Sequence, residues 1–223
     1  MKTIPKMLVS GLGFLVLLGL LLFLPAGTFA YWQAWVLVVL AISTRIFSAY
    51  LLRVNPAVLE RRMRGGPKAE TRTAQKVAMA ALWLSLAAMF VVSALDHRFG
   101  WSPVPTAISL VGDVLVAVGL GVAMLVVLQN SHAAATVQVE SGQKLVSTGL
   151  YGLVRHPMYA GNVIMMVGIP LALDSYWGLV FVVPGVSGLA FRIRDEEKLL
   201  KDDLAGYREY AQEVRYRLVP GIW

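Results

Sequence analysis

Long apolar runs are the feature that most constrains this chain. Four of them, Leu8 to Leu24, Tyr31 to Leu52, Val77 to Leu95 and Ile108 to Leu128, each contain about 17 to 22 residues. A helix rises about 1.5 Å per residue, so runs of this length cross a hydrocarbon layer about 30 Å thick. The composition agrees, because 57% of the 223 residues are hydrophobic and only 15% are charged. The sequence therefore predicts an all-α, polytopic integral membrane protein with four transmembrane helices in this part.

Two shorter apolar runs follow, Tyr159 to Leu173 and Tyr176 to Phe191, and Asp174-Ser175 separates them. Each run reaches about 22–24 Å as a helix. We expect a C-terminal transmembrane helical hairpin whose tip lies near the far membrane face. Beyond it, residues Asp195 to Glu213 place apolar side chains at helical spacing, which predicts an amphipathic, cytoplasmic interfacial helix.

The basic residues indicate how the chain crosses the membrane. Of 20 Lys and Arg, only Arg98 falls in a predicted outer loop and only Arg45 within a span. By the positive-inside rule both termini are cytoplasmic, which requires an even number of membrane crossings. The two arms of the hairpin, added to the four spans, give an even number. Topology thus explains the net charge of +7 better than nucleic-acid binding does. The short loops suit a bacterial inner membrane. Residues 1–30 resemble a secretory signal peptide, but their apolar run is long for one, so we expect a retained anchor.

Several kinds of site are not predicted. The chain has no Cys, which excludes disulfides, thiolate nucleophiles and cysteine metal sites. Its three His residues lack the spacing of metal ligands, so no metal is implied. Gly11-Leu12-Gly13 and Gly119-Leu120-Gly121 lack the third glycine of the dinucleotide fingerprint, so no soluble nucleotide domain is expected.

A polar, aromatic segment lies between the fourth span and the hairpin. It reads Gly149-Leu150-Tyr151-Gly152-Leu153-Val154-Arg155-His156-Pro157-Met158-Tyr159-Ala160-Gly161. Pro157 suits the first position of a helix, whose free N–H groups and positive dipole end can receive a carboxylate. Arg155 adds a bidentate donor, and Tyr159 lies within one turn of His156. Such a cluster at a membrane helix start indicates a ligand.

The second half of the predicted site lies at the exit of the hairpin, in Arg192-Ile193-Arg194-Asp195-Glu196-Glu197. If both arms of the hairpin reach the same membrane face, Arg155-His156 and Arg194-Glu197 are about a helix diameter apart. One His, several Arg, two Tyr and paired carboxylates suit a zwitterionic, hydroxyl-bearing small ligand.

Several motifs occur in a specific order over roughly residues 125–223. They are Val146-Ser147-Thr148-Gly149-Leu150-Tyr151, Arg155-His156-Pro157-Met158-Tyr159-Ala160-Gly161, Pro170-Leu171-Ala172-Leu173-Asp174-Ser175, Arg194-Asp195-Glu196-Glu197, Gly206-Tyr207-Arg208-Glu209-Tyr210 and Val214-Arg215-Tyr216-Arg217-Leu218-Val219-Pro220-Gly221-Ile222-Trp223. In this order they resemble the isoprenylcysteine carboxyl methyltransferase family, which is similar to the phospholipid N-methyltransferases. Members use S-adenosylmethionine at the membrane surface without a Rossmann domain. The resemblance implies N-terminal transmembrane helices over residues 1–128 and a methyltransferase-like catalytic region over residues 129–223, within one integrated domain.

The resemblance also implies site residues, because His156, Tyr159 and the Glu196-Glu197 pair map onto the cofactor-binding motifs of the family. We expect the cofactor-binding set to be Tyr151, Arg155, His156, Pro157, Tyr159, Glu196 and Glu197, and the catalytic set to be Arg194, Glu197 and Tyr159. Arg155, His156 and the helix start would hold the carboxylate and adenosyl parts of the cofactor. Glu196 or Glu197 would bind its ribose hydroxyls or ammonium, and Arg194 would orient an anionic acceptor.

The acceptor and the reaction stay open at this stage. A lipophilic carboxylate is favoured, because its charge and that of the sulfonium cancel in the transition state and a dry pocket assists this. Methylation of a phospholipid or another amine would need a base, for which His156, Glu196 or Tyr159 are candidates. A reductase of the sterol reductase type with a nicotinamide cofactor, and a non-catalytic transporter or assembly factor, are further alternatives. We expect lipids as partners, no nucleic acid and an undetermined oligomeric state.

Overall fold

The computed structural model describes all residues except 1–2, 65–71, 134–138 and 140–141. The described residues form helices and no strand, which confirms the all-α prediction. In chain order these are α1 (Thr3–Ala26), α2 (Trp32–Val54), α3 (Pro56–Arg64), α4 (Thr73–Phe99), α5 (Thr106–Gln129), a 3₁₀ helix η1 (Gly149–Gly152), α6 (Pro157–Ala172), a second 3₁₀ helix η2 (Trp177–Phe181), α7 (Val182–Asp203) and α8 (Tyr207–Glu213).

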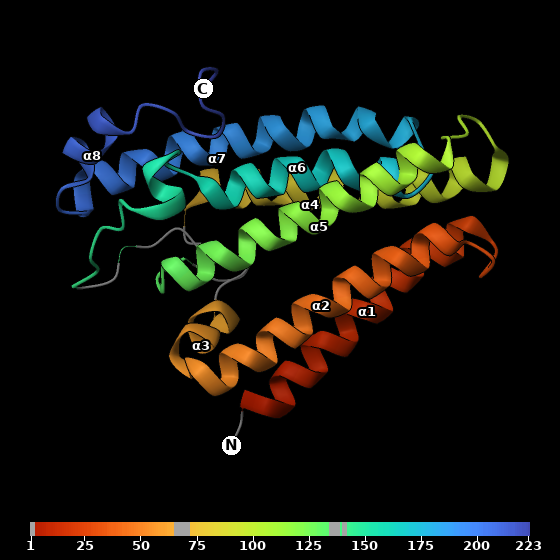
Figure 1. The fold of residues 1–223 in the computed structure, drawn as a ribbon, viewed down its shortest axis with the longest axis horizontal. Helices are drawn as coiled ribbons and strands as arrows, with labels where there is room; N and C mark the ends of the chain where they lie inside the picture. Colours follow the sequence, from red (N-terminus) through yellow and green to blue (C-terminus); the bar gives the residue numbers. More distant parts are fainter. Residues whose placement is uncertain (1–2, 65–71, 134–138, 140–141) are drawn as a thin grey trace.

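The four predicted spans form the long helices α1, α2, α4 and α5, each long and apolar enough to cross a membrane. Figure 1 shows α4, α5, α6 and α7 running side by side, with α1 and α2 along one flank of this group. Many large apolar side chains on these helices are exposed, as expected where lipid and not protein covers them. The chain is therefore an integral membrane protein.

The C-terminal hairpin differs in length from the prediction. Its first arm, α6, has 16 residues. Asp174 turns the chain with a φ of 60°, and the second arm then runs through η2 and α7 to Asp203, a stretch of 27 residues. The predicted interfacial helix over Asp195 to Glu213 is therefore wrong at its start, because its first half continues α7 without a break. Gly206, with a φ of 81°, begins a new direction, and α8 covers only Tyr207–Glu213.

Helices α5 and α6 pack closely through glycines. A Cβ atom at Gly119 would lie 2.6 Å from the carbonyl oxygen of Gly161, and one at Gly168 would lie 2.8 Å from that of Gly112. The pairing of Gly112 with Gly168 and of Gly119 with Gly161 is antiparallel. Small residues at such crossings let two membrane helices approach until their backbones touch. This contact fixes where the start of α6 lies relative to the end of α5.

A polar network ties together the loops at the end of the molecule opposite α8. The carboxylate of Asp96 is buried and accepts hydrogen bonds from the backbone and hydroxyl of Ser102 and from the hydroxyl of Ser175. Asp174 accepts a bond of 2.7 Å from the Val104 N–H. These contacts connect the α4–α5 loop to the tip of the hairpin, and they pair the polar side chains of Asp174 and Ser175 within the protein.

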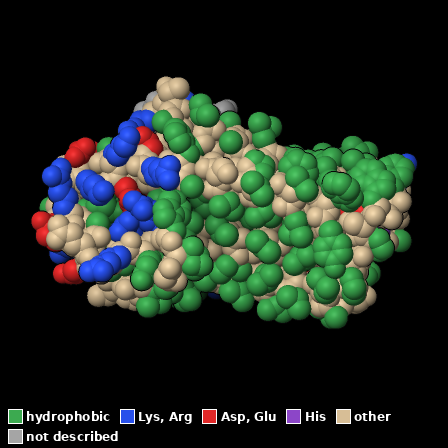
Figure 2. Space-filling model, turned by 90° about the horizontal axis from the view of Figure 1, so that it is seen from above, with side chains coloured by type: hydrophobic (Ala, Val, Ile, Leu, Met, Phe, Trp, Pro, Cys, Tyr) green, Lys and Arg blue, Asp and Glu red, His purple; other side chains and the backbone are tan. Residues whose placement is uncertain are grey.

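Charged side chains gather at the other end, which carries α8, whereas the remaining visible surface is largely apolar (Figure 2). This division is that of a protein whose apolar part lies in lipid and whose charged end is in water. The start of α6 and the end of α7 lie at this charged end (Figure 1).

Candidate active site

The start of α6 has the predicted form. His156 is the N-cap residue and Pro157 is the first residue of the helix. The backbone N–H groups of Arg155 and His156 donate to the carbonyls of Tyr216 and Arg217 at 2.9 and 3.0 Å. The segment before α6 is therefore paired with the C-terminal tail, which fixes both side chains at the helix start.

Glu197 forms the centre of a buried ion cluster behind the helix start. Its Oε1 accepts a 2.8 Å bond from Nε of Arg155, and its Oε2 accepts bonds of 3.0 and 2.9 Å from Arg217. The Nε2 atom of His156 lies 3.4 Å from Oε1. Both carboxylate oxygens are thus occupied by protein groups. Glu197 holds Arg155 and His156 in place and is not among the residues that line the cavity.

Arg155 is itself largely used within the protein. Besides Glu197, its Nη1 atom donates to the carbonyls of Ala211, Val214 and Arg215, at 3.1, 2.9 and 3.1 Å. Its side chain is buried but reaches the cavity wall. Arg155 therefore serves first to join the start of α6 to α7, to α8 and to the segment after α8. Its Nη2 group is what it can offer to a ligand.

A second polar chain runs through Tyr159. Its hydroxyl donates to Oε2 of Glu196 at 2.6 Å and accepts a 3.0 Å bond from Nε of Arg192. Arg192 also donates from Nη1 to Gln75 of α4 at 2.8 Å, and both of these side chains are buried. This chain of hydrogen bonds holds the Glu196 carboxylate at the cavity wall, where it can accept further bonds. The Tyr159 hydroxyl is already bonded to two protein groups.

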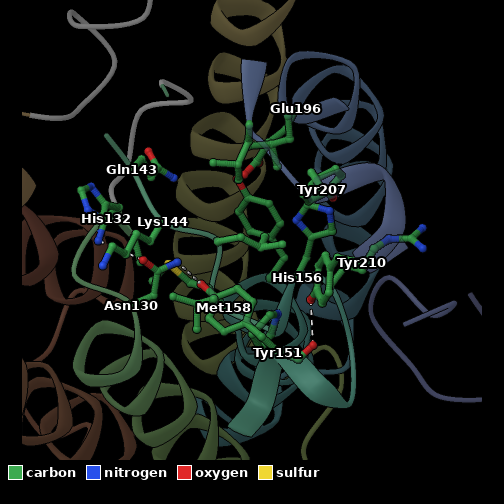
Figure 3. A pocket seen from close by; sticks show the side chains of 18 residues that line it. Asn130, His132, Gln143, Lys144, Tyr151, His156, Met158, Glu196, Tyr207 and Tyr210 are labelled. Atoms are coloured by element: carbon green, nitrogen blue, oxygen red, sulfur yellow. Dashed lines mark hydrogen bonds between the residues drawn. The ribbon is translucent and has the colours of Figure 1, made fainter. Parts of the chain in front are cut away.

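The cavity lies between these groups and the segment that follows α5. Its lining includes six of the predicted residues, namely Tyr151, Arg155, His156, Pro157, Tyr159 and Glu196, together with Asn130, His132, Ala133, Gln143, Lys144, Leu145, Val146, Met158, Leu200, Leu204, Tyr207 and Tyr210. In Figure 3, Glu196, Tyr207 and Tyr210 lie on one side and Asn130, His132, Gln143 and Lys144 on the other. The rings of His156 and Tyr159 are stacked, with centroids 5.6 Å apart. The hairpin thus brings two distant segments together on one cavity.

Arg194 is not brought to this cluster. It is exposed on α7 and does not line the cavity. At about 100° per residue, Arg194 points about 200° away from both Arg192 and Glu196. The buried arginine of this helix is Arg192, to which the sequence analysis gave no role. The run of charged residues from 192 to 197 does not indicate which side chain faces inward.

Two more site residues escaped the sequence analysis, Gln75 and Arg217. Gln75 lies on α4, and its amide donates to Asp195 at 2.6 Å. Arg217 lies in the tail and binds Glu197. Arg217 belongs to the C-terminal motif of the family resemblance, which gave it no role. Gln75 is a polar residue just before the predicted span Val77 to Leu95, which is a weak signal. Among the described residues, no group of His, Cys, Asp and Glu could hold a metal ion.

Burial raises the pKa of three tyrosine hydroxyls beside the cavity, those of Tyr151, Tyr207 and Tyr210. For Tyr207 and Tyr210 loss of solvation is the largest cause, and nearby carboxylates add to it for Tyr207. The pKa of Tyr151 is also raised by burial, although its hydrogen bond from Asn130 opposes this. These phenols therefore stay protonated at neutral pH, so each can donate a hydrogen bond.

Comparison with known proteins finds a family match over part of the chain. Residues 107–204 match the phospholipid methyltransferase family. The expected relationship to membrane methyltransferases is confirmed for this part, which begins with α5 and includes α6 and α7. The matched residues contain Tyr151, the start of α6 and the Glu196-Glu197 pair.

The fold is similar to that of a solved membrane enzyme, the eukaryotic intramembrane Ras methyltransferase isoprenylcysteine carboxyl methyltransferase. The similarity has a TM-score of 0.52 at 18% identity and covers 92% of this chain and 74% of that one. A curated relative, the Delta(14)-sterol reductase TM7SF2 of Mus musculus, is 31% identical over 91 residues. That alignment spans 40% of this chain and 22% of the reductase, so the chain matches about a fifth of that relative.

Proposed function

We propose that the protein is a membrane-embedded methyltransferase that uses S-adenosylmethionine and acts on a lipophilic acceptor. The observation that carries this proposal is the cavity at the charged end, where the first turn of α6 meets Glu196 and the α8 tyrosines. The same residues lie largely within the stretch that matches the phospholipid methyltransferase family. Because the charged end follows the positive-inside pattern, we place it, both termini and the cavity in the cytoplasm of a bacterial cell.

The residues around the cavity fit the groups of this cofactor. The free N–H groups at the start of α6 and Nη2 of Arg155 suit its carboxylate. Glu196, held by Tyr159, suits its ammonium or ribose hydroxyls, and the aromatic faces of Tyr159 and His156 suit its sulfonium. When bound, the cofactor supplies an activated methyl group. The protein's part is to position both partners and exclude water.

A carboxylate is the acceptor that the cavity favours. Lys144 lines the side opposite Glu196 and is exposed. It has no partner among the residues that the structure describes, so its ammonium can attract an anion. This assigns to Lys144 the role that the sequence analysis gave to Arg194. The first turn of α6 carries Met158, which packs against apolar residues of α2 and α3 and gives the lipid part of an acceptor an apolar path.

Two other reactions have an observation in their favour. Methylation of a phospholipid amine is supported by the family that residues 107–204 match. In that case Glu196 is the carboxylate at the cavity able to accept the amine proton. A reductase that uses a nicotinamide cofactor is supported by the 31% identity to the sterol reductase over 91 residues.

Binding and product analysis with the purified protein distinguish these three possibilities. Calorimetry in detergent should show saturable binding of S-adenosylmethionine and none of NADPH. Incubation with methyl-labelled cofactor and a total lipid extract should then give a labelled ester that alkali cleaves. A label that resists alkali and migrates with a phospholipid would show N-methylation instead. Binding of NADPH alone would overturn the methyltransferase proposal.

A further inference from the structure

Tyr207 carries a buried hydroxyl that has no partner in the described part of the chain. The residue is 3% exposed, and its hydroxyl forms no hydrogen bond to any residue that the structure describes. A buried hydroxyl that loses its hydrogen bond to water and gains none in the protein destabilises the fold. Tyr207 also lines the cavity. An unpaired donor in such a place indicates a bond that a ligand completes.

The other three tyrosines of the cavity differ in this respect. The hydroxyl of Tyr210 donates to the Tyr151 carbonyl at 2.7 Å, that of Tyr151 accepts from Asn130 at 3.0 Å, and that of Tyr159 binds Glu196 and Arg192. The protein thus uses these hydroxyls to hold its own elements. Tyr207 has no such use, since replacing it with phenylalanine would remove no hydrogen bond within the part of the chain that the structure describes.

The surroundings of Tyr207 indicate which part of a ligand it would meet. It packs in an apolar cluster with Leu204 and Tyr210, against Leu145 and Leu200, and all five residues line the cavity. Its ring meets that of Tyr210 edge to face, with centroids 5.7 Å apart. An apolar wall with one hydrogen-bonding group suits a flat heteroaromatic ring, which needs stacking and few polar contacts.

We propose that Tyr207 contacts the adenine ring of the cofactor and that its hydroxyl forms a hydrogen bond with a ring nitrogen. This inference rests on the function proposed above. The amino-acid end of the cofactor would then lie at Glu196 and the start of α6, on the polar side of the same cavity. Because burial raises the pKa of Tyr207, the hydroxyl stays protonated and donates to the ring.

The test compares Tyr207→Phe with the wild-type protein in detergent. The variant should unfold at the same temperature or slightly above it, because a buried unpaired hydroxyl is removed. Its affinity for S-adenosylhomocysteine, measured by calorimetry, should fall about threefold to tenfold, the range of one neutral hydrogen bond. The affinity for 5′-methylthioadenosine, which has the adenine but no amino-acid end, should fall by the same factor.

Two control variants keep this test decisive. Tyr50→Phe changes a tyrosine that is 48% exposed on α2 and should alter neither stability nor affinity. Tyr210→Phe removes a protein hydrogen bond and should lower the unfolding temperature, which Tyr207→Phe should not do. Unchanged affinity of Tyr207→Phe for both ligands would overturn the inference while the proposed function stands. A loss confined to S-adenosylhomocysteine would overturn the adenine assignment, and a wild-type protein that binds neither ligand would overturn the proposed function itself.

Discussion

Glu196 and Glu197 are neighbours in the sequence but have different surroundings. Glu197 is buried, and its two oxygens accept hydrogen bonds from Arg155 and Arg217. Glu196 is half-buried and lines the cavity, where Tyr159 occupies one of its oxygens. The sequence analysis placed both residues in the cofactor-binding set and placed Glu197 also in the catalytic set. The structure separates a carboxylate that maintains the site from one that can contact a ligand.

Replacing Glu197 should therefore affect folding first. In Glu197→Gln the guanidinium groups of Arg155 and Arg217 lose their counter-charge, and we expect a loss of about 3–5 kcal/mol in the free energy of unfolding. Denaturation in mixed micelles measures this. Asp202→Asn is the matched control, because Asp202 pairs with Arg208 at 3.2 Å but both side chains are largely exposed, and we expect a loss of about 0–1 kcal/mol. Equal losses in the two variants would contradict the role given to Glu197.

Replacing Glu196 should affect binding first. A glutamine can still accept the Tyr159 hydrogen bond, so Glu196→Gln should unfold within about 1 kcal/mol of the wild type. Its affinity for S-adenosylmethionine should fall about tenfold or more, because a charge-assisted bond is lost. Calorimetry measures the change, and Glu209→Gln, which alters an exposed carboxylate of α8, is the control. If Glu196→Gln bound the cofactor normally, the carboxylate would have no part in binding it.

At the residue scale, the sequence identified the helix start but not the inward-facing side of α7. Pro157 and its neighbours were recognisable because a proline, an arginine and a histidine seldom occur together between apolar runs unless they serve a site. The charges of α7 offered no comparable signal. When a helix end carries charges on every side, its sequence does not indicate which face turns inward. Arg192 was therefore passed over for Arg194. The partners supplied by Gln75 and Arg217 depend on contacts between distant elements, which one sequence does not show.

At the element scale, the contact between α5 and α6 controls the site. It joins the helix that ends beside the cavity to the one that starts there, through the glycine pairs Gly112–Gly168 and Gly119–Gly161. The spans and the hairpin were predictable because about 20 apolar residues in a row have few stable conformations other than a membrane helix. The continuation of α7 to Asp203 was not predictable, because the last turns of this helix are polar and resemble a surface helix.

A methyl group between these helices should separate them. In Gly119→Ala the new Cβ would lie 2.6 Å from the Gly161 carbonyl oxygen, and neither backbone can yield without moving its helix. We expect about 1–3 kcal/mol of destabilisation, together with weaker cofactor binding as the start of α6 shifts. Thermal unfolding and calorimetry measure the two effects. Gly121→Ala, two residues away, is the control, because its Cβ meets nothing within 4 Å, and it should leave both quantities unchanged or raise stability slightly.

At the scale of the whole molecule, charge and apolar surface are divided along the long axis (Figure 2). The predicted boundary between residues 128 and 129 stays a prediction, since α5 ends there but packs along α6, and the family match begins earlier, at residue 107. The orientation proposed above rests on this division of the surface. The proposal places the charged end in the cytoplasm because Lys and Arg near membrane helices are enriched on that side, and the cavity lies at the end that carries them.

That orientation can be tested directly because the chain has no cysteine, so any single cysteine introduced is the only thiol. Gln212→Cys places it on α8, Thr106→Cys at the start of α5, and Val114→Cys on the apolar surface of α5, where the side chain is 61% exposed. In sealed right-side-out bacterial vesicles, a membrane-impermeant maleimide should label Thr106→Cys and leave Gln212→Cys unlabelled. In inverted vesicles the two results should exchange, and Val114→Cys should be labelled in neither because lipid covers it. The opposite pattern would place the cavity outside the cell, where S-adenosylmethionine is not made, and the proposed reaction could not occur there.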